Sequence, residues 1–200
     1  MAAAKKTKTT ARKATAETIH DSFIVGAGIS GIAAAIKLKR EGYNDFKIIE
    51  KADRVGGTWR ENTYPGCGCD VPSSLYSYSF APNPNWSRSF SGSEEILGYI
   101  HHLVAEFKLE SHIRFEKNVE DLSFDEKKGV WTATTDKGEK FAGRAAGMAQ
   151  GPLSNCSFPA ITGIEDFKGH KIHSARWDHD YDFADKKVAV IGTGASGIQI

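Results

Sequence analysis

The chain has 200 residues, of which 40% are hydrophobic and 26% are charged, and its formal net charge at pH 7 is +1. This composition is typical of a soluble globular protein, and the length suffices for one good-sized hydrophobic core. No apolar stretch is long enough to span a membrane, and the N-terminus lacks the apolar core of a secretory signal. Cys67, Cys69 and Cys156 have no metal-binding spacing, which indicates reduced thiols in a cytoplasmic protein and no metal site.

Residues 1–20 form a basic segment with five Lys or Arg residues against one Glu. The segment is rich in Ala, Thr and Lys and has almost no apolar residues, so we predict a disordered, solvated arm. A nucleic-acid-binding or organelle-targeting role is the alternative reading of its charge. We predict no nucleic-acid partner.

The next elements form a strand, a glycine turn, a helix and a second strand that ends in an acid. Strands are predicted at 22–26 and 46–50, with a helix over 30–41 between them. The turn reads Gly26-Ala27-Gly28-Ile29-Ser30-Gly31, and Glu50 ends the second strand. This order and spacing is the fingerprint of a dinucleotide-binding βαβ unit, and a glycine-rich turn without a ligand is the alternative.

Each residue of the fingerprint has a predicted physical role. Gly26 permits the tight turn, Gly28 lets the backbone approach a pyrophosphate, and Gly31 lets the helix lie close to the strand. The free N–H groups and the positive end of the helix dipole then hold the phosphates. Glu50 accepts hydrogen bonds from ribose hydroxyls, and its charge disfavours a 2′-phosphate. FAD or NAD therefore fits this first site better than NADP.

Residues 51–92 are predicted to form a long loop, and loops of this length are usually functional. A helix with one apolar face is predicted to begin at Ser93, with His101 and His102 at its surface rather than acting as ligands. Short strands are predicted at three places and form a β-meander that crosses over within the first fold. These strands are 113–124, 130–135 and 139–142. Residues 144–149 are expected to return to the main sheet.

A second glycine motif lies near the C-terminus. Residues 187–191 are predicted to be a buried strand, followed by Gly192-Thr193-Gly194-Ala195-Ser196-Gly197 and the start of a helix. Two such motifs imply two nucleotides, and the second fold is present only as its first strand and turn. We therefore predict that the chain is the N-terminal part of a longer protein.

Two longer motifs identify a family. The loop contains Gly57-Thr58-Trp59, Tyr64-Pro65-Gly66 and Asp70, and Phe167, Gly169, His173, Trp177 and Asp178 follow with fixed spacing before the second glycine turn. With these motifs the sequence resembles the Baeyer–Villiger monooxygenases, which are FAD- and NADPH-dependent enzymes, from about Asp21 to Ile200. In the related flavin-containing monooxygenases that oxidise nitrogen and sulfur, the second motif ends in a different aromatic residue and a basic one. The Trp177-Asp178 pair therefore favours the Baeyer–Villiger group.

The predicted fold class is α/β, and the chain is predicted to have four parts. These are a disordered arm at 1–20, a Rossmann-like FAD-binding domain with a β-meander crossover at 21–160, a linker at 161–185 and the start of an NADP-binding Rossmann domain at 186–200. Ala149-Gln150-Gly151 occupies a further glycine motif, with Gln150 where the family usually has Thr. The predicted FAD-binding residues are Gly26, Gly28, Ser30, Gly31, Glu50, Gly57, Thr58, Trp59, Asp70, Tyr76, Val119 and Gly151. NADP is expected on the 68–70 stretch and on Gly192, Thr193, Gly194, Ser196, Gly197 and Gln199.

The implied reaction inserts one oxygen of O₂ beside a ketone carbonyl by way of a flavin peroxide and gives an ester or lactone. Asp70 is the predicted catalytic residue, because in the family the matching aspartate orients an arginine, expected beyond residue 200, that stabilises the peroxide. His173 and Trp177 are interpreted as linker residues that couple NADP docking to domain movement, not as a general base. Two alternatives are a monooxygenase that acts on nitrogen or sulfur and a non-catalytic FAD-binding fragment. A disulfide reductase is excluded, since Cys67-Gly68-Cys69 has the wrong spacing for its redox pair.

Overall fold

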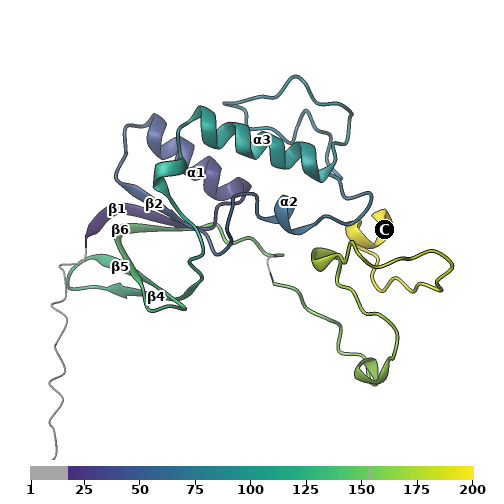
Figure 1. Ribbon diagram of the computed structural model, residues 1–200. Coiled ribbons are helices and arrows are strands. Elements are labelled where there is room, and N and C mark those ends of the chain that lie inside the picture. The colour runs from purple at the N-terminus through teal and green to yellow at the C-terminus, as the bar shows by residue number, and fades with distance from the viewer. Residues whose placement is uncertain (1–17, 154) are drawn as a thin grey trace, which may run out of the picture.

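The computed structural model describes residues 18–153 and 155–200, so almost all of the predicted basic arm lies outside the described residues. A six-stranded sheet has the order β3-β2-β1-β6-β5-β4 (Figure 1). Its strands are β1 (Ile19–Val25), β2 (Phe46–Ile49), β3 (Ile113–Arg114), β4 (Val119–Asp125), β5 (Val130–Thr135) and β6 (Lys140–Met148). The helices are α1 (Ile29–Arg40), α2 (Thr58–Glu61), α3 (Ser93–Glu106) and α4 (Ala195–Gln199), with 3₁₀ turns η1 (Glu110–His112), η2 (Ile164–Asp166) and η3 (Ser174–Arg176).

The centre of the sheet is parallel and buried on both faces. β1 pairs in parallel with β2 and with β6, and β2 pairs in parallel with β3. Ile24 points into a cluster beneath the helices, whereas Phe23 and Val25 point into a second cluster with Phe141 on the opposite face. This explains why the last three residues of β1 are a continuous apolar run rather than an alternating one.

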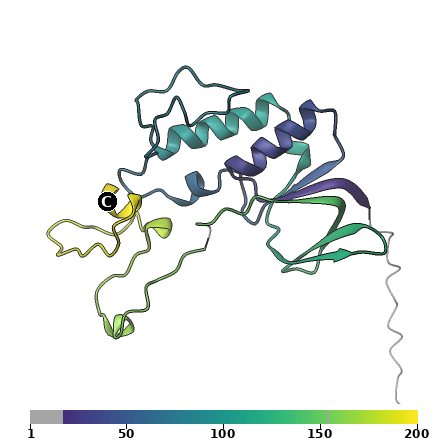
Figure 2. The same ribbon diagram turned by 180° about the vertical axis from the view of Figure 1, so that it is seen from behind.

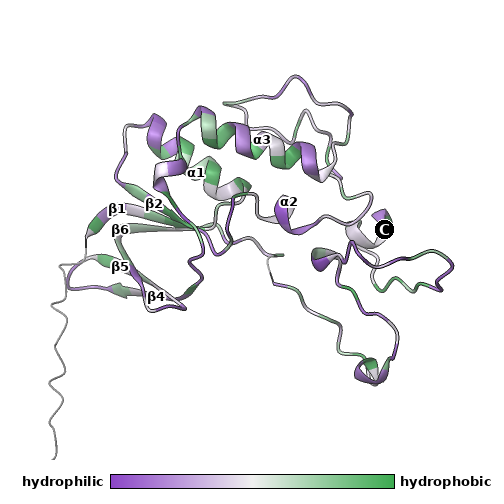
Figure 3. Ribbon diagram, in the orientation of Figure 1, coloured by the Kyte–Doolittle hydropathy of each residue, from purple (hydrophilic) through white to green (hydrophobic). Residues whose placement is uncertain are grey.

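Helices α1 and α3 lie side by side on one face of the sheet, and the view from behind shows the same layer (Figures 1 and 2). Hydrophobic and hydrophilic residues alternate along both helices (Figure 3), as expected for helices with one buried face. Ile96, Ile100, Leu103 and Val104 of α3 are buried, which confirms the predicted apolar face. His101 and His102 are exposed, as predicted.

The long loop is ordered by its own hydrogen bonds and contains one helical turn, α2. The Ser73 and Ser91 hydroxyl oxygens are 2.8 Å apart, and both residues are buried. The backbone N–H of Cys69 donates to the Ser91 carbonyl at 2.9 Å. These contacts tie the middle of the loop to the start of α3.

Three predicted strands are wrong in detail. The strand predicted at 113–124 is divided into β3 and β4, because the chain turns at Glu116 (φ 56°) and returns to hydrogen-bond with Ala52. The stretches predicted separately at 139–142 and 144–149 form one continuous strand, β6, which pairs with β5 on one side and with β1 on the other. The meander is thus a part of the main sheet.

The strand predicted at 187–191 is absent. Val188, Val190 and Ile191 are exposed, and no segment among residues 18–153 and 155–200 pairs with this stretch. A strand requires a neighbour for its backbone groups, so the apolar sequence alone does not form one. In the part of the chain that the structure describes, no helix has the length and apolar character needed to cross a membrane.

Candidate nucleotide-binding site

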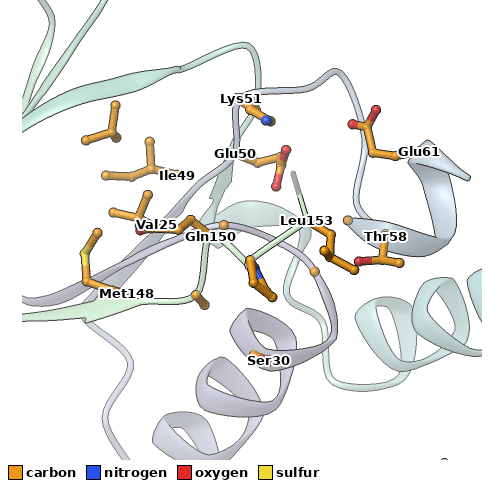
Figure 4. Close-up of a pocket in the computed structure, with 18 of the residues that line it drawn as sticks. Val25, Ser30, Ile49, Glu50, Lys51, Thr58, Glu61, Met148, Gln150 and Leu153 are labelled. Carbon is orange, nitrogen blue, oxygen red and sulfur yellow. The ribbon is translucent and has the colours of Figure 1, made fainter. Parts of the chain in front are cut away.

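A cavity of about 410 Å³ lies at the carboxyl ends of β1, β2 and β6 (Figure 4). It is lined by the first glycine turn, by residues around the start of α2, by residues 117–122 and by residues 148–153. The predicted residues that line it are Gly26, Gly28, Ser30, Glu50, Gly57, Thr58, Trp59, Tyr76, Val119 and Gly151. Ligands of open parallel sheets bind at this edge, where the connections diverge.

Gly26 and Gly31 hold the turn closed. Gly26 has a φ of +104°, and a Cβ there would lie 2.4 Å from the Ala149 carbonyl oxygen. A Cβ on Gly31 would lie 1.9 Å from the Gly26 carbonyl oxygen. Only glycine fits either position, so both predicted structural roles are supported by the geometry.

Gly28 has no comparable structural reason to be glycine. Its φ of −79° suits any residue, and a Cβ would meet the Gly57 backbone at no less than 3.5 Å, an ordinary van der Waals distance. Gly28 lines the cavity at the N-terminus of α1, where no side chain caps the helix. The missing Cβ therefore leaves backbone N–H groups accessible to an anion in the cavity.

Glu50 is a buried carboxylate that is hydrogen-bonded to this turn. Its Oε2 accepts a hydrogen bond from the Ala27 N–H at 2.7 Å, and its Oε1 accepts from the Ala52 N–H at 2.9 Å and from Arg60 Nη1 at 3.3 Å. A carboxylate oxygen has two acceptor positions, so Oε2 retains one for a ligand hydroxyl. This fits the predicted ribose contact.

Trp59 and Tyr76 form one wall of the cavity. The Trp59 indole N–H donates to the Tyr76 hydroxyl at 3.0 Å, and the two rings meet edge to face. Burial is the main cause that raises the pKa of the Tyr76 phenol, and the charge of Asp70 adds to it. Asp70 itself is exposed and does not line the cavity, so the structure brings it near the wall but not to the cavity surface.

The second glycine turn has the geometry of the first. Gly192 has a φ of +130°, Gly194 precedes α4 in an extended conformation, and a Cβ on Gly197 would lie 2.6 Å from the Gly192 carbonyl oxygen. Thr193 belongs to this turn. The turn conformation is therefore encoded locally, although the strand predicted before it is absent.

This second turn lies against the long loop. The Tyr64 hydroxyl is 2.7 Å from Gln199 Oε1 and 3.1 Å from Ser196 Oγ, and Gln199 Nε2 donates to the Gly68 carbonyl at 2.9 Å. The structure thus brings together the 68–70 stretch and the second turn, the two segments predicted to contact one nucleotide.

The second long motif holds the turns of the linker. His173 Nδ1 accepts a hydrogen bond from the Ala175 N–H at 3.1 Å and so caps η3, and the Asp178 carboxylate pairs with His170 at 2.9 Å. Trp177 meets the Tyr64 ring edge to face. Phe167, 59% exposed, lies over Gly169, where a Cβ would be 2.4 Å from its ring. These contacts agree with a linker role for the motif, in which His173 caps η3.

Four charged residues at the site have ion pairs that the motifs did not predict. Arg60 pairs with Glu50 and Glu61, and Glu61 also pairs with Arg176. Arg60-Glu61 directly follows one motif and Arg176 precedes Trp177 of the other, so charges flanking the two motifs were the available signal.

No group of three or more His, Cys, Asp or Glu side chains within the described ranges, 18–153 and 155–200, is arranged to hold a metal ion.

Comparison with known proteins agrees with this geometry. Residues 24–92 match the family model of the NAD(P)-binding Rossmann-like domain. A Baeyer–Villiger monooxygenase of Streptomyces coelicolor is 49% identical over 187 residues, which are 92% of this chain and 36% of that protein. A Baeyer–Villiger monooxygenase of Pseudomonas aeruginosa is 44% identical over 176 residues, or 88% of this chain and 33% of that protein. The predicted relationship to the Baeyer–Villiger monooxygenases is confirmed.

The solved structures extend this relationship to the fold. An oxidized steroid monooxygenase bound to NADP is 44% identical with a TM-score of 0.81, over 91% of this chain and 36% of that one. The OTEMO complex with FAD and NADP is 36% identical with a TM-score of 0.82, over 92% of this chain and 36% of that one. The chain thus spans about a third of the length of its Baeyer–Villiger relatives, and the predicted α/β Rossmann-like fold class is confirmed.

Proposed function

We propose that the first cavity binds FAD. The observation that carries the proposal is the placement of Gly28 and Glu50 in the lining of one cavity, at the N-terminus of α1 and directly after β2. Gly28 exposes N–H groups for the pyrophosphate, and Glu50 Oε2 retains an acceptor position for the adenosine ribose. Thr58, Trp59 and Tyr76 would border the flavin, and Val119 the adenine. The Ser30, Gly57 and Gly151 positions complete the lining.

We further propose that NADPH binds between the second glycine turn and the long loop. Gly192, Thr193, Gly194, Ser196 and Gly197 would hold its phosphates on the N-terminal side of α4. Gln199 already bridges to Gly68 and would set the distance between the two segments.

The proposed activity of the whole protein is Baeyer–Villiger oxidation of a small-molecule ketone with O₂. When bound, FAD reduced by NADPH would activate O₂ for insertion beside a ketone carbonyl, with an ester or lactone as product. The chain itself would bind and orient both cofactors and exclude water from the flavin side of Trp59 and Tyr76. Asp70 would act by orienting a cation near the flavin, because an exposed carboxylate beside that wall attracts one.

The domain organisation remains part of the proposal, with an FAD-binding domain at 21–160, a linker at 161–185 and the start of an NADP-binding domain at 186–200. The cytoplasmic localisation is likewise proposed, and it rests on the three free cysteines.

The visible absorption spectrum of the purified chain tests the function. The chain is purified with FAD and its spectrum is recorded before and after anaerobic addition of NADPH, with NADH as the matched control. Retained flavin bands support the FAD site, and bleaching by NADPH but not NADH supports the second site. A preparation without flavin bands contradicts FAD binding by this chain. Bands that NADPH leaves unbleached contradict a working NADPH site within these residues.

A further inference from the structure

A chain of ion pairs runs from the cavity to the linker. Arg60 Nη1 lies 3.3 Å from the Glu50 carboxylate, and Arg60 also pairs with Glu61. Glu61 in turn pairs with Arg176, the last residue of η3 in the linker. Glu50 and Glu61 reach into the same region of the cavity from β2 and α2 (Figure 4). Three successive ion pairs thus connect the carboxylate beside the proposed ribose site to the linker.

The four ion-paired residues carry no net charge while Arg176 is in place. The side chains of Glu50, Arg60 and Glu61 are 5%, 6% and 16% exposed, whereas that of Arg176 is 52% exposed. Two carboxylates and two guanidinium groups cancel. Without Arg176, Glu50 and Glu61 share the Arg60 guanidinium, and Lys51, whose charge also lowers the pKa of Glu61, is a further cation of the cavity lining. The cavity wall then carries one positive charge less, which is costly for buried carboxylates.

Glu61 is charged in this arrangement. Burial acts to raise the pKa of its carboxyl group, but the hydrogen bond from Arg60 and the charges of Arg60 and Arg176 outweigh burial and lower that pKa. Arg60 also has a partner outside these two ion pairs, since its Nη1 donates to the Arg54 carbonyl at 2.6 Å. The guanidinium therefore bridges the two carboxylates, with Nη1 toward Glu50 and Nη2 toward Glu61.

We propose that Glu61 and Arg176 are positioning residues that couple docking of the linker to the binding of a diphosphate ligand at Glu50. The inference rests on the proposed function, in which that ligand is FAD. When Arg176 leaves, Glu61 draws Arg60 away from Glu50, and the cavity becomes more negative by one charge. Both changes weaken the binding of a ligand that carries a pyrophosphate and a ribose. By linkage, the bound ligand stabilises the docked linker to the same extent.

FAD titration of the full chain, followed by flavin fluorescence, tests the coupling. R176Q is expected to raise the Kd for FAD about three- to tenfold, in the lower part of the range for residues coupled in one network. R176K is expected to restore most of the affinity. E61Q removes the carboxylate that competes for Arg60, so it is the background in which the effect of R176Q is measured again. In the E61Q background, R176Q is expected to have no further effect. K171Q is the matched control, because Lys171 forms an ion pair with Glu165 in the same linker but away from the cavity.

Hydrogen exchange of the linker amides at 170–178 supplies the reciprocal measurement. FAD should slow exchange there in the wild type and not in R176Q. If the role of Arg176 is purely structural, R176Q should weaken FAD binding in the wild-type and in the E61Q background alike, and that result would overturn the coupling. An unchanged Kd for FAD in R176Q would also overturn it. If the wild-type chain binds no FAD, the proposed function fails and the inference fails with it. If the wild type binds FAD and R176Q binds it equally well, only the coupling fails.

Discussion

Gly31→Ala is expected to destabilise the fold even though it improves the helix propensity of α1. The new Cβ would lie 1.9 Å from the Gly26 carbonyl oxygen, whereas Cβ atoms essentially never approach within 3.0 Å of such an atom. The obstacle is backbone, and Gly26 is itself fixed by its φ of +104° and by its N–H bond to the Ile49 carbonyl. The helix must therefore move away from β1.

The magnitude follows from two opposing contributions. Forcing extra volume into a packed region costs about 1–3 kcal/mol, and a backbone obstacle places this site at the upper end. Replacing a helical glycine by alanine returns about 1 kcal/mol. We expect a net loss of about 2 kcal/mol in the free energy of unfolding, or roughly 4–8 °C in Tm for a chain of this size.

Gly28→Ala and Gly98→Ala are the matched controls. At Gly28 the nearest protein atom to the new Cβ is 3.5 Å away, so the unfolding free energy should change by less than about 1 kcal/mol. The Kd for FAD, however, should rise by about tenfold or more, equivalent to about 1.4 kcal/mol, because the methyl group occupies the place proposed for the pyrophosphate. Gly98 in α3 has no neighbour within 4 Å of a new Cβ, so Gly98→Ala should stabilise the chain by about 1 kcal/mol without affecting FAD.

Urea denaturation gives the unfolding free energies of the three variants, and flavin fluorescence gives the affinities. An unchanged denaturation midpoint in Gly31→Ala would refute the packing argument. Equal losses of stability in Gly28→Ala and Gly31→Ala would show that the fold also requires glycine at position 28. The argument that the Gly28 backbone faces a ligand would then fail.

Three further predictions concern the charged site and the second turn. Glu50→Gln should lower both FAD affinity and stability, the latter by about 3 kcal/mol because buried Arg60 loses a charged partner; unchanged urea denaturation would contradict this. Gly197→Ala places a Cβ 2.6 Å from the Gly192 carbonyl oxygen, so flavin bands should persist while bleaching by NADPH is lost, and retained bleaching would rule out the second site. The pKa of Glu61 is lowered from its ordinary value of 4.5, so its contribution to stability is present above that value and is lost as the pH falls through the lower folded-state pKa. Urea denaturation at pH 3–6 should therefore show a smaller acid loss in E61Q than in the wild type, and equal losses would contradict it.

The sequence predicted the first fold well because its signals are local. An apolar run, a glycine turn and an amphipathic helix each follow from the neighbouring residues. Helix α1 lies within one residue of its predicted bounds, and α3 begins at the predicted residue, Ser93. The β-meander was harder. Whether 139–149 is one strand or two depends on pairing with both β1 and β5, and that pairing is not visible in the sequence of the segment.

The ion-pair chain was missed for a related reason. Arg60 and Glu61 are neighbours in sequence, but their partners Glu50 and Arg176 lie 10 and 115 residues away, respectively. Charged residues beside a motif are commonly solvated, so their type alone does not indicate burial. Only the return of the linker to α2 gives Glu61 its second partner.

The two glycine turns separate what is encoded locally from what is not. Both have a left-handed first glycine and a last glycine closed against its carbonyl, yet only the first turn follows a paired strand. The turn conformation thus depends on glycine at two positions, whereas the strand depends on neighbours in a sheet. What positions the second turn here is the contact of Ser196 and Gln199 with Tyr64 and Gly68. Because those contacts come from the loop that also borders the first cavity, any movement of the loop changes both proposed nucleotide sites together.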